Sequence, residues 1–149
     1  MIRTHIQCVS GEAEIPRNND LRNWVETALQ CIDRGEADLT LRLVGLDEMQ
    51  KLNARYRNKD EPTNVLSFSF DIPSEVQNGL FGDIIICVPV VEQEARNFQL
   101  PCTDRWAHMI VHGVLHLCGY DHNNEDEAFR MEQLEGNILQ HLGFADPYN

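Results

Sequence analysis

The chain lacks the cysteine spacing that would indicate a structural zinc ion or a disulfide framework. Its five cysteines are odd in number, and none of them forms a Cys-x-x-Cys pair. This usage is typical of reduced thiols and favours a cytoplasmic protein. Long hydrophobic runs are also missing, because the longest, residues 84–91, is too short to span a membrane and contains Pro89. Residues 1–5 likewise lack the apolar stretch of a signal peptide.

Basic residues are scarce. The chain has 12 lysines and arginines against 24 aspartates and glutamates, which gives a net charge of −12 at pH 7. Such a protein repels phosphate at long range, so it cannot coat nucleic acid indiscriminately. An RNA partner would need a local basic patch, and the sequence offers one candidate: Lys51, Arg55, Arg57 and Lys59. On charge alone, this segment is interpreted as the solvated end of a helix.

The order of the predicted elements indicates a single α+β domain over residues 1–149. A chain of this length buries about two-thirds of its unfolded surface. Apolar patterning predicts strands over residues 2–9, 39–43, 65–70 and 82–88. Helical spacing predicts helices over residues 21–32, 47–56, 90–98, 103–117 and 126–142. The order β-α-β-α-β-β-α-α-α predicts a small mixed sheet with helices packed on it.

Polar residues at the starts of three of these helices are expected to cap them. The candidates are residues 18–20, Asp47 and residues 123–126. The polar stretches 58–64 and 71–79 are expected to be loops, since they contain proline, glycine and asparagine.

The helix predicted over residues 103–117 is apolar on almost every side. Such a helix is central in a protein rather than superficial. Its separate stripe of histidines, His108, His112 and His116, must therefore line a cleft or be satisfied inside the protein. We interpret His108 as a hydrogen-bonded residue or a partner of the site, in preference to a fourth ligand.

Three histidines, His112, His116 and His122, have the spacing of a catalytic metal site. With ~3.6 residues per turn, the first two lie one above the other on one helix face. Gly119 allows the chain to leave the helix and turn back, which can bring His122 round as a third ligand. Three protein ligands leave one position of a tetrahedral zinc site open. Cys118 is interpreted as a packing residue, with a ligand role as the alternative.

The same stretch lacks the glutamate of the zinc-protease pattern His-Glu-x-x-His-x-x-Gly-x-x-His. Gly113 stands in that position, and the missing proton shuttle counts against peptide hydrolysis. Phosphodiester cleavage instead needs a cation near the metal to stabilise charge on the phosphate oxygens, and arginine suits this need. Asp121, next to His122, could assist catalysis, or it could be a turn residue or a partner of a metal ligand.

Three segments match a known family. Residues 112–122 agree at every specified position with the hallmark His-Gly-x-Leu-His-Leu-x-Gly-Tyr-Asp-His. Residues 52–68 read Leu-Asn-x-x-Tyr-Arg-x-x-Asp-x-Pro-Thr-Asn-Val-Leu-Ser-Phe, and residues 82–84 read Gly-Asp-Ile. In these segments the chain resembles the YbeY family of bacterial endoribonucleases, also described as rRNA maturation factors. Asn64 stands where some relatives have aspartate. The segments cover about the C-terminal two-thirds of the chain.

The resemblance implies a small α+β metalloprotein fold related to zincins, with one zinc ion per chain held by His112, His116 and His122. It implies that Arg57 takes part in catalysis alongside His112, with Arg55 and Lys59 as weaker candidates. The implied activity is the cleavage of single-stranded RNA in rRNA maturation, at the 3′ end of 16S rRNA, and in ribosome quality control. The implied partners are single-stranded RNA, rRNA and ribosomal subunits, with no DNA and no membrane.

Two other functions are compatible with the residues. One is a non-catalytic ribosome-assembly factor in which zinc is a structural staple, favoured by the acidic composition and the missing general base. The other is a metalloprotease. Nitrogen ligands also accept nickel and other ions, so the residues leave the metal open.

Overall fold

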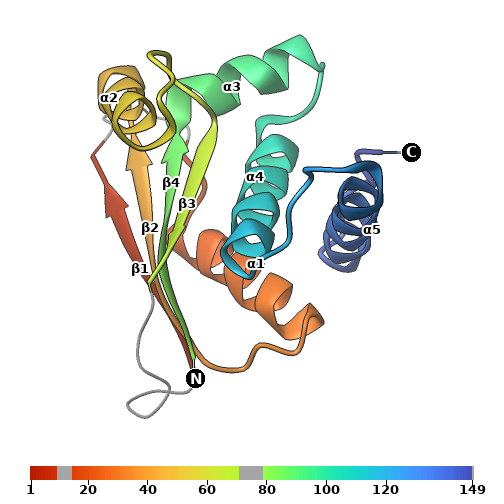
Figure 1. Cartoon of the computed structure of the whole chain (residues 1–149). Helices are drawn as coiled ribbons and strands as arrows, with labels where there is room; N and C mark the ends of the chain where they lie inside the picture. The colour runs from red at the N-terminus through yellow and green to blue at the C-terminus, as the bar shows by residue number, and fades with distance from the viewer. Residues whose placement is uncertain (10–14, 71–78, 149) are drawn as a thin grey trace.

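The computed structural model describes residues 1–9, 15–70 and 79–148, and within them it has four strands and five helices in the predicted order (Figure 1). They are β1 (Ile2–Cys8), α1 (Asn18–Cys31), β2 (Ala37–Val44), α2 (Leu46–Arg57), β3 (Val65–Ser69), β4 (Leu80–Cys87), α3 (Val88–Asn97), α4 (Cys102–Leu117) and α5 (Glu125–His141). The predicted α+β class is therefore confirmed. The loop predicted over residues 71–79 falls, except for its last residue, outside the described residues.

The four strands form one mixed sheet in the order β1-β2-β4-β3. The pairs β1–β2 and β2–β4 are parallel, whereas β3 runs antiparallel to β4 at the edge of the sheet. The central strand β4 is apolar almost throughout because both of its faces are covered. Ile84 and Ile86 belong to the main core, while Ile85 and Cys87 belong to a smaller cluster that includes Met49 of α2.

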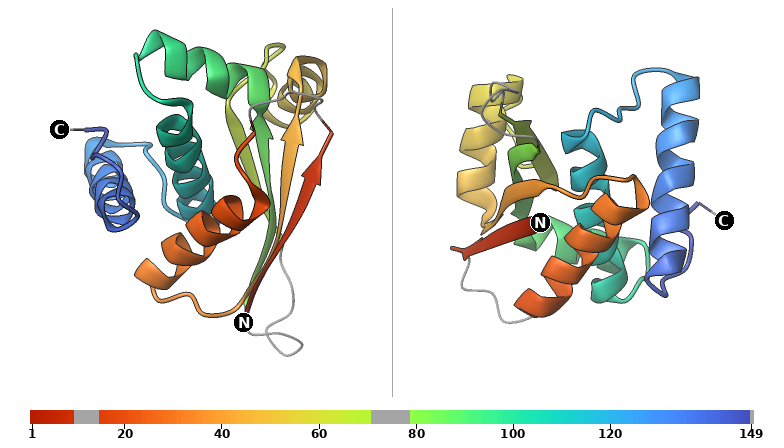
Figure 2. Two further views of the ribbon diagram at one scale, coloured as in Figure 1. Left: turned by 180° about the vertical axis from the view of Figure 1, so that it is seen from behind. Right: turned by 90° about the horizontal axis from the view of Figure 1, so that it is seen from below.

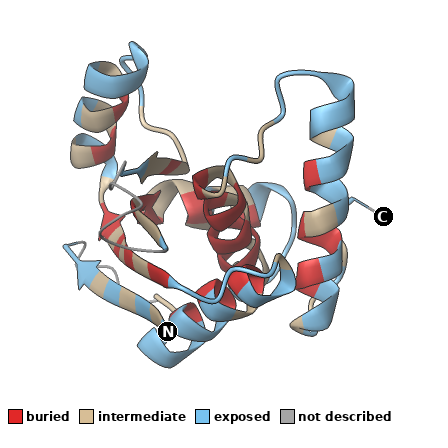
Figure 3. Ribbon diagram, turned by 60° about the horizontal axis from the view of Figure 1, so that its bottom comes forward, coloured by how far each residue is buried: buried red, intermediate tan, exposed pale blue. Residues whose placement is uncertain are grey.

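The helices on the main face of the sheet form two further layers. Helices α1 and α4 pack next to the sheet, and α5 lies beyond them on the side away from the strands (Figure 2). Helix α4 is buried along most of its length, as its apolar sequence predicted (Figure 3). Its histidine-bearing end therefore lies between the edge strand β3 and the outer helix α5.

Two of the predicted helix caps are wrong. Helix α1 begins one residue after Arg17, and α2 begins one residue after Gly45, and neither preceding residue makes a side-chain capping bond. The acidic residues predicted as caps, within residues 18–20 and at Asp47, lie instead in the first turns. There a carboxylate is favoured by the helix dipole without capping a backbone amide.

The third predicted cap is confirmed. Asn124 precedes α5, and its side-chain oxygen accepts a hydrogen bond from the backbone N–H of Glu127 at 2.9 Å. Within the described part of the chain, none of the helices combines the length and the apolar character that a membrane span requires.

Candidate metal centre

The end of α4 carries the turn that the sequence predicted. Gly119 adopts a left-handed conformation with a φ of +97°. Its N–H donates to the carbonyl of His116 at 3.0 Å, and the N–H of Tyr120 donates to the carbonyl of Leu115 at 3.0 Å. These two bonds form a Schellman motif, which ends the helix and reverses the chain. The reversal brings His122 back beside the helix.

The three predicted histidines converge. One potential ligand atom from each of His112, His116 and His122 lies within 4.8 Å of the others. The ring centres of His112 and His116 are 4.5 Å apart, and that of His122 lies 5.1 Å from His116. Donor atoms at such separations can surround one cation, and imidazole suits zinc and similar ions. The donor set therefore fits a single metal ion.

His116 is adapted to act as a ligand. Burial lowers the pKa of His116, and the neighbouring His112 and His122 lower it further, against a weaker opposing effect of Asp121. A metal binds the unprotonated imidazole, so this shift favours binding over protonation.

Asp121 holds the turn in place. One carboxylate oxygen accepts the backbone N–H of His122 at 2.8 Å, and the other accepts the side-chain amide of Asn123 at 2.9 Å. The bond from the His122 backbone is the main cause that lowers the pKa of Asp121. These contacts support the interpretation as a turn residue, and a catalytic role for Asp121 stays a prediction.

Gly113 faces the sheet and not the metal site. A Cβ atom at this position would lie 2.9 Å from the Cγ2 of Ile84 and 3.2 Å from the Cγ2 of Val65. The hydroxyl of Ser67 also donates to the carbonyl of Gly113 at 2.9 Å, which ties β3 to α4. The position of the missing protease glutamate is therefore filled by close packing between helix and sheet.

A Gly113→Glu substitution, which restores the protease pattern, is expected to lower the free energy of unfolding by at least about 3 kcal/mol. It forces a carboxylate into a packed interface without a partner. Urea unfolding measures the loss. Gly35→Glu is the matched control, since a Cβ atom at Gly35 meets nothing within 4 Å. A Gly113→Glu protein as stable as the parent, with peptidase activity gained, would contradict this account.

The histidines open into a cavity of about 570 Å³. Its walls come from the end of α2, the loop 58–64, strand β3 and the turn after α4. Two residues of the basic segment, Arg57 and Lys59, line this cavity. The other two, Lys51 and Arg55, line a separate hollow on α2. The four basic residues of one sequence segment therefore line two different hollows.

Arg57 is held at the rim of the cavity by β3. Its guanidinium donates to the backbone carbonyl of Ser67 at 3.4 Å and lies 5.7 Å from the centre of the Phe68 ring. Arg57 and the three histidines therefore line the same cavity.

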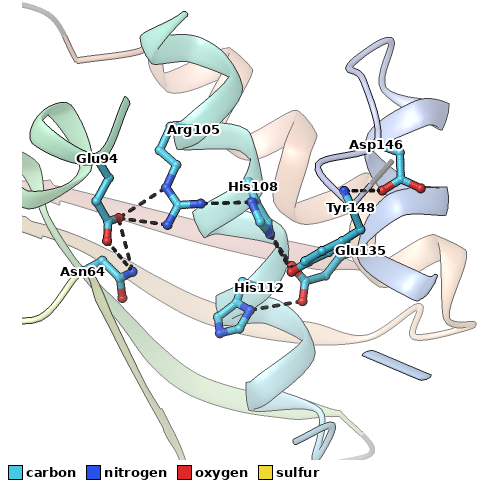
Figure 4. Close-up of polar contacts among 8 residues, drawn as sticks. All are labelled: Asn64, Glu94, Arg105, His108, His112, Glu135, Asp146 and Tyr148. Atoms are coloured by element: carbon cyan, nitrogen blue, oxygen red, sulfur yellow. Dashed lines mark hydrogen bonds and ion pairs between the residues drawn. The ribbon is translucent and has the colours of Figure 1, made fainter. Parts of the chain in front are cut away.

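A buried polar network on the far side of His112 was not predicted (Figure 4). Glu135 of α5 accepts hydrogen bonds from His108, from His112 at 3.2 Å and from the Tyr148 hydroxyl at 3.0 Å. Arg105 links His108 to Glu94. Burial alone would raise the pKa of Glu135, but the bonds and charges of the two histidines lower it to about 2. The sequence contained one sign of this network, because Glu135 is a charged residue among the apolar positions of the last helix.

The contacts of His108 and Cys118 agree with their interpretation as a hydrogen-bonded residue and a packing residue. His108 hydrogen-bonds within this network, and it is not among the three clustered ligands. Cys118 packs against the main core, where burial raises the pKa of its thiol.

Fold and site together define a small α+β protein with three converging histidines at the end of its central helix and an arginine across the cavity. The sequence pattern of the family described as "Endoribonuclease YbeY" matches residues 5–143. The chain belongs to this family. Its membership supports endoribonuclease activity, and so a hydrolase that acts on RNA.

Named relatives agree with this assignment. The chain is 46% identical over 144 residues to "Endoribonuclease YbeY" of Cellvibrio japonicus, with 97% of this chain and 81% of the relative covered. It is also 46% identical over 144 residues to "Endoribonuclease YbeY" of Idiomarina loihiensis, with 95% and 88% covered. The solution structure of TM1509 from Thermotoga maritima superposes with a TM-score of 0.57 at 26% identity, covering 96% of this chain and 92% of that one.

Proposed function

We propose that this protein is a metal-dependent endoribonuclease that cleaves single-stranded RNA. In the cell it would act in the cytoplasm on rRNA and ribosomal subunits, in the maturation of the 3′ end of 16S rRNA and in ribosome quality control. The observation that carries the proposal is the shared cavity: three imidazoles that fit one metal ion and the Arg57 guanidinium line the same walls.

The proposed roles follow from the positions of the side chains. His112, His116 and His122 would hold the ion, for which zinc is proposed. A bound ion of this kind supplies Lewis acidity toward phosphate and water. Arg57 donates to the phosphate oxygens as their charge increases, with Lys59 adding positive charge on the same wall. Asp121 keeps the turn that presents His122.

The size and lining of the cavity favour an unpaired strand. The cavity of about 570 Å³ can take unpaired nucleotides that leave the strand and enter it. Unpaired nucleotides can be splayed into such a site, whereas paired ones stay stacked in the helix. Arg57 and Lys59 place two cationic side chains on the cavity walls, and an acidic protein needs such local cations to bind phosphate.

Purified protein is expected to cut a single-stranded RNA from the 3′ region of 16S rRNA when loaded with zinc. After chelation cleavage should fall to background, and it should return when zinc is added back. A fully paired duplex of the same sequence should be cut at least about tenfold more slowly. Cleavage by the metal-free protein, or equal cleavage rates for the single strand and the duplex, would contradict the proposal.

A further inference from the structure

Glu135 is a carboxylate in an unusual place. It is 1% exposed and lies on α5, on the side of α4 turned away from the cavity. Burying a charged group is costly unless hydrogen bonds satisfy it. The carboxylate meets two histidines of α4 and a tyrosine that follows α5, and one of those histidines, His112, also belongs to the histidine cluster.

The hydrogen positions on His108 can be deduced from its neighbours. The guanidinium of Arg105 lies 3.2 Å from the Nδ1 of His108, and a guanidinium can only donate. Nδ1 is therefore the acceptor, and the hydrogen of the ring is on Nε2, which donates to Oε2 of Glu135. The Tyr148 hydroxyl donates to the same oxygen at 3.0 Å. Two donors thus anchor Oε2.

The other oxygen, Oε1, is directed at His112. It lies 3.2 Å from Nδ1 of that ring, while the second ring nitrogen is on the opposite side, away from Glu135 (Figure 4). An ionised carboxylate can only accept, so Nδ1 of His112 carries the hydrogen. The lone pair of Nε2 is then free. A partner of this kind fixes both the tautomer and the orientation of a metal-binding imidazole.

We propose that Glu135 is a positioning residue of the metal site, which holds His112 with its Nε2 lone pair toward His116 and His122. The inference rests on the metal site of the proposed function and adds a residue to it. Asp121 had been a candidate partner of a metal ligand, and the hydrogen bonds of its two oxygens go to the backbone of His122 and the side chain of Asn123. The positioning carboxylate comes instead from α5, anchored by His108 and Tyr148.

The first test is metal affinity, measured by competition with a chromophoric chelator for Zn²⁺ and Co²⁺. Glu135→Gln, which keeps the size but removes the charge, is expected to weaken binding of both ions about 10- to 100-fold. Glu132→Gln is the matched control, because it makes the same change at an exposed carboxylate of α5 three residues away. Its affinities should stay within about threefold of the parent. Equal affinities for Glu135→Gln and the parent would overturn the inference.

The second test uses the unmodified chain, so it holds even where Glu135→Gln fails to fold. In the metal-free protein, long-range proton–nitrogen spectra should show the hydrogen of His112 on Nδ1. A hydrogen found on Nε2 instead would overturn the inference. RNA cleavage is measured separately: a parent that binds zinc tightly without cutting RNA would refute the proposed function and leave the role of Glu135 standing.

Discussion

Arg57→Ala is expected to reduce the cleavage of single-stranded RNA by about 10²- to 10³-fold while the protein keeps its metal. The size of the effect is that of removing one donor to a charge that develops in the transition state. Arg57 is exposed, and its guanidinium makes one 3.4 Å bond to the carbonyl of Ser67 and one contact with the Phe68 ring, so its loss should leave the unfolding midpoint nearly unchanged. Single-turnover rates at saturating zinc measure the chemical step without interference from weakened binding.

Helix α2 supplies a control for this variant. Arg55 is also exposed and lies two residues earlier, but its guanidinium rests 5.3 Å from the centre of the Tyr56 ring and does not line the cavity. Arg55→Ala has the same change in net charge and should stay within about twofold of the parent rate. The cleavage rate of Arg57→Lys should lie between those of the parent and Arg57→Ala, since lysine keeps the charge without the planar guanidinium. Similar losses of cleavage rate for Arg55→Ala and Arg57→Ala would show that Arg57 contributes only general positive charge.

Replacement of His116 with alanine is expected to abolish tight zinc binding and bring RNA cleavage to background. It removes one of three ligands and leaves two, which rarely hold zinc in competition with water. His112→Ala should have the same effect on cleavage, but it also deprives buried Glu135 of a donor. His116→Ala is therefore the cleaner variant. Zinc content after dialysis and cleavage rates measure the two effects, and His141→Ala, an exposed histidine at the end of α5, is the control.

The same variant separates a catalytic ion from a structural staple. The main core joins α1, α4, α5 and the sheet through apolar side chains that do not include the three ligands. The metal-free protein should therefore keep its helix content and unfold cooperatively. Its unfolding midpoint should be below that of the zinc form only by the amount that the free energy of zinc binding accounts for. An unfolded metal-free chain, together with no RNA cleavage by the zinc form, would support the assembly-factor alternative.

The close packing around Gly113 and the position of Glu135 explain how one helix serves two purposes. On the sheet side, α4 approaches β3 and β4 so closely that only glycine fits. On the α5 side, it presents His108 and His112 to a buried carboxylate. The third side carries the histidines that face the cavity. Helix α4 is thus tied to both neighbouring layers, to β3 through Ser67 and to α5 through Glu135, and contacts of this kind favour preorganised side chains.

Much of the site could be inferred from spacing along the chain. The helical period places His112 over His116, and a glycine after the helix permits the reversal that returns His122. The element order and the burial of β4 on both faces also followed from apolar patterning. These features depend on local backbone geometry, which neighbouring residues determine. The helix starts were less predictable, because a polar residue serves equally well as a cap or in the first turn.

Other features depend on segments that are distant in sequence. Arg55 and Arg57 are equivalent in charge, and the packing of α2 against the sheet alone directs the second one into the cavity. Glu135 lies 23 positions from His112, and the docking of α5 onto α4 brings them together. Gly113 is required because β3 and β4 approach the helix there. Local patterning shows which side chains share a helix face, but the packing of layers determines what that face meets.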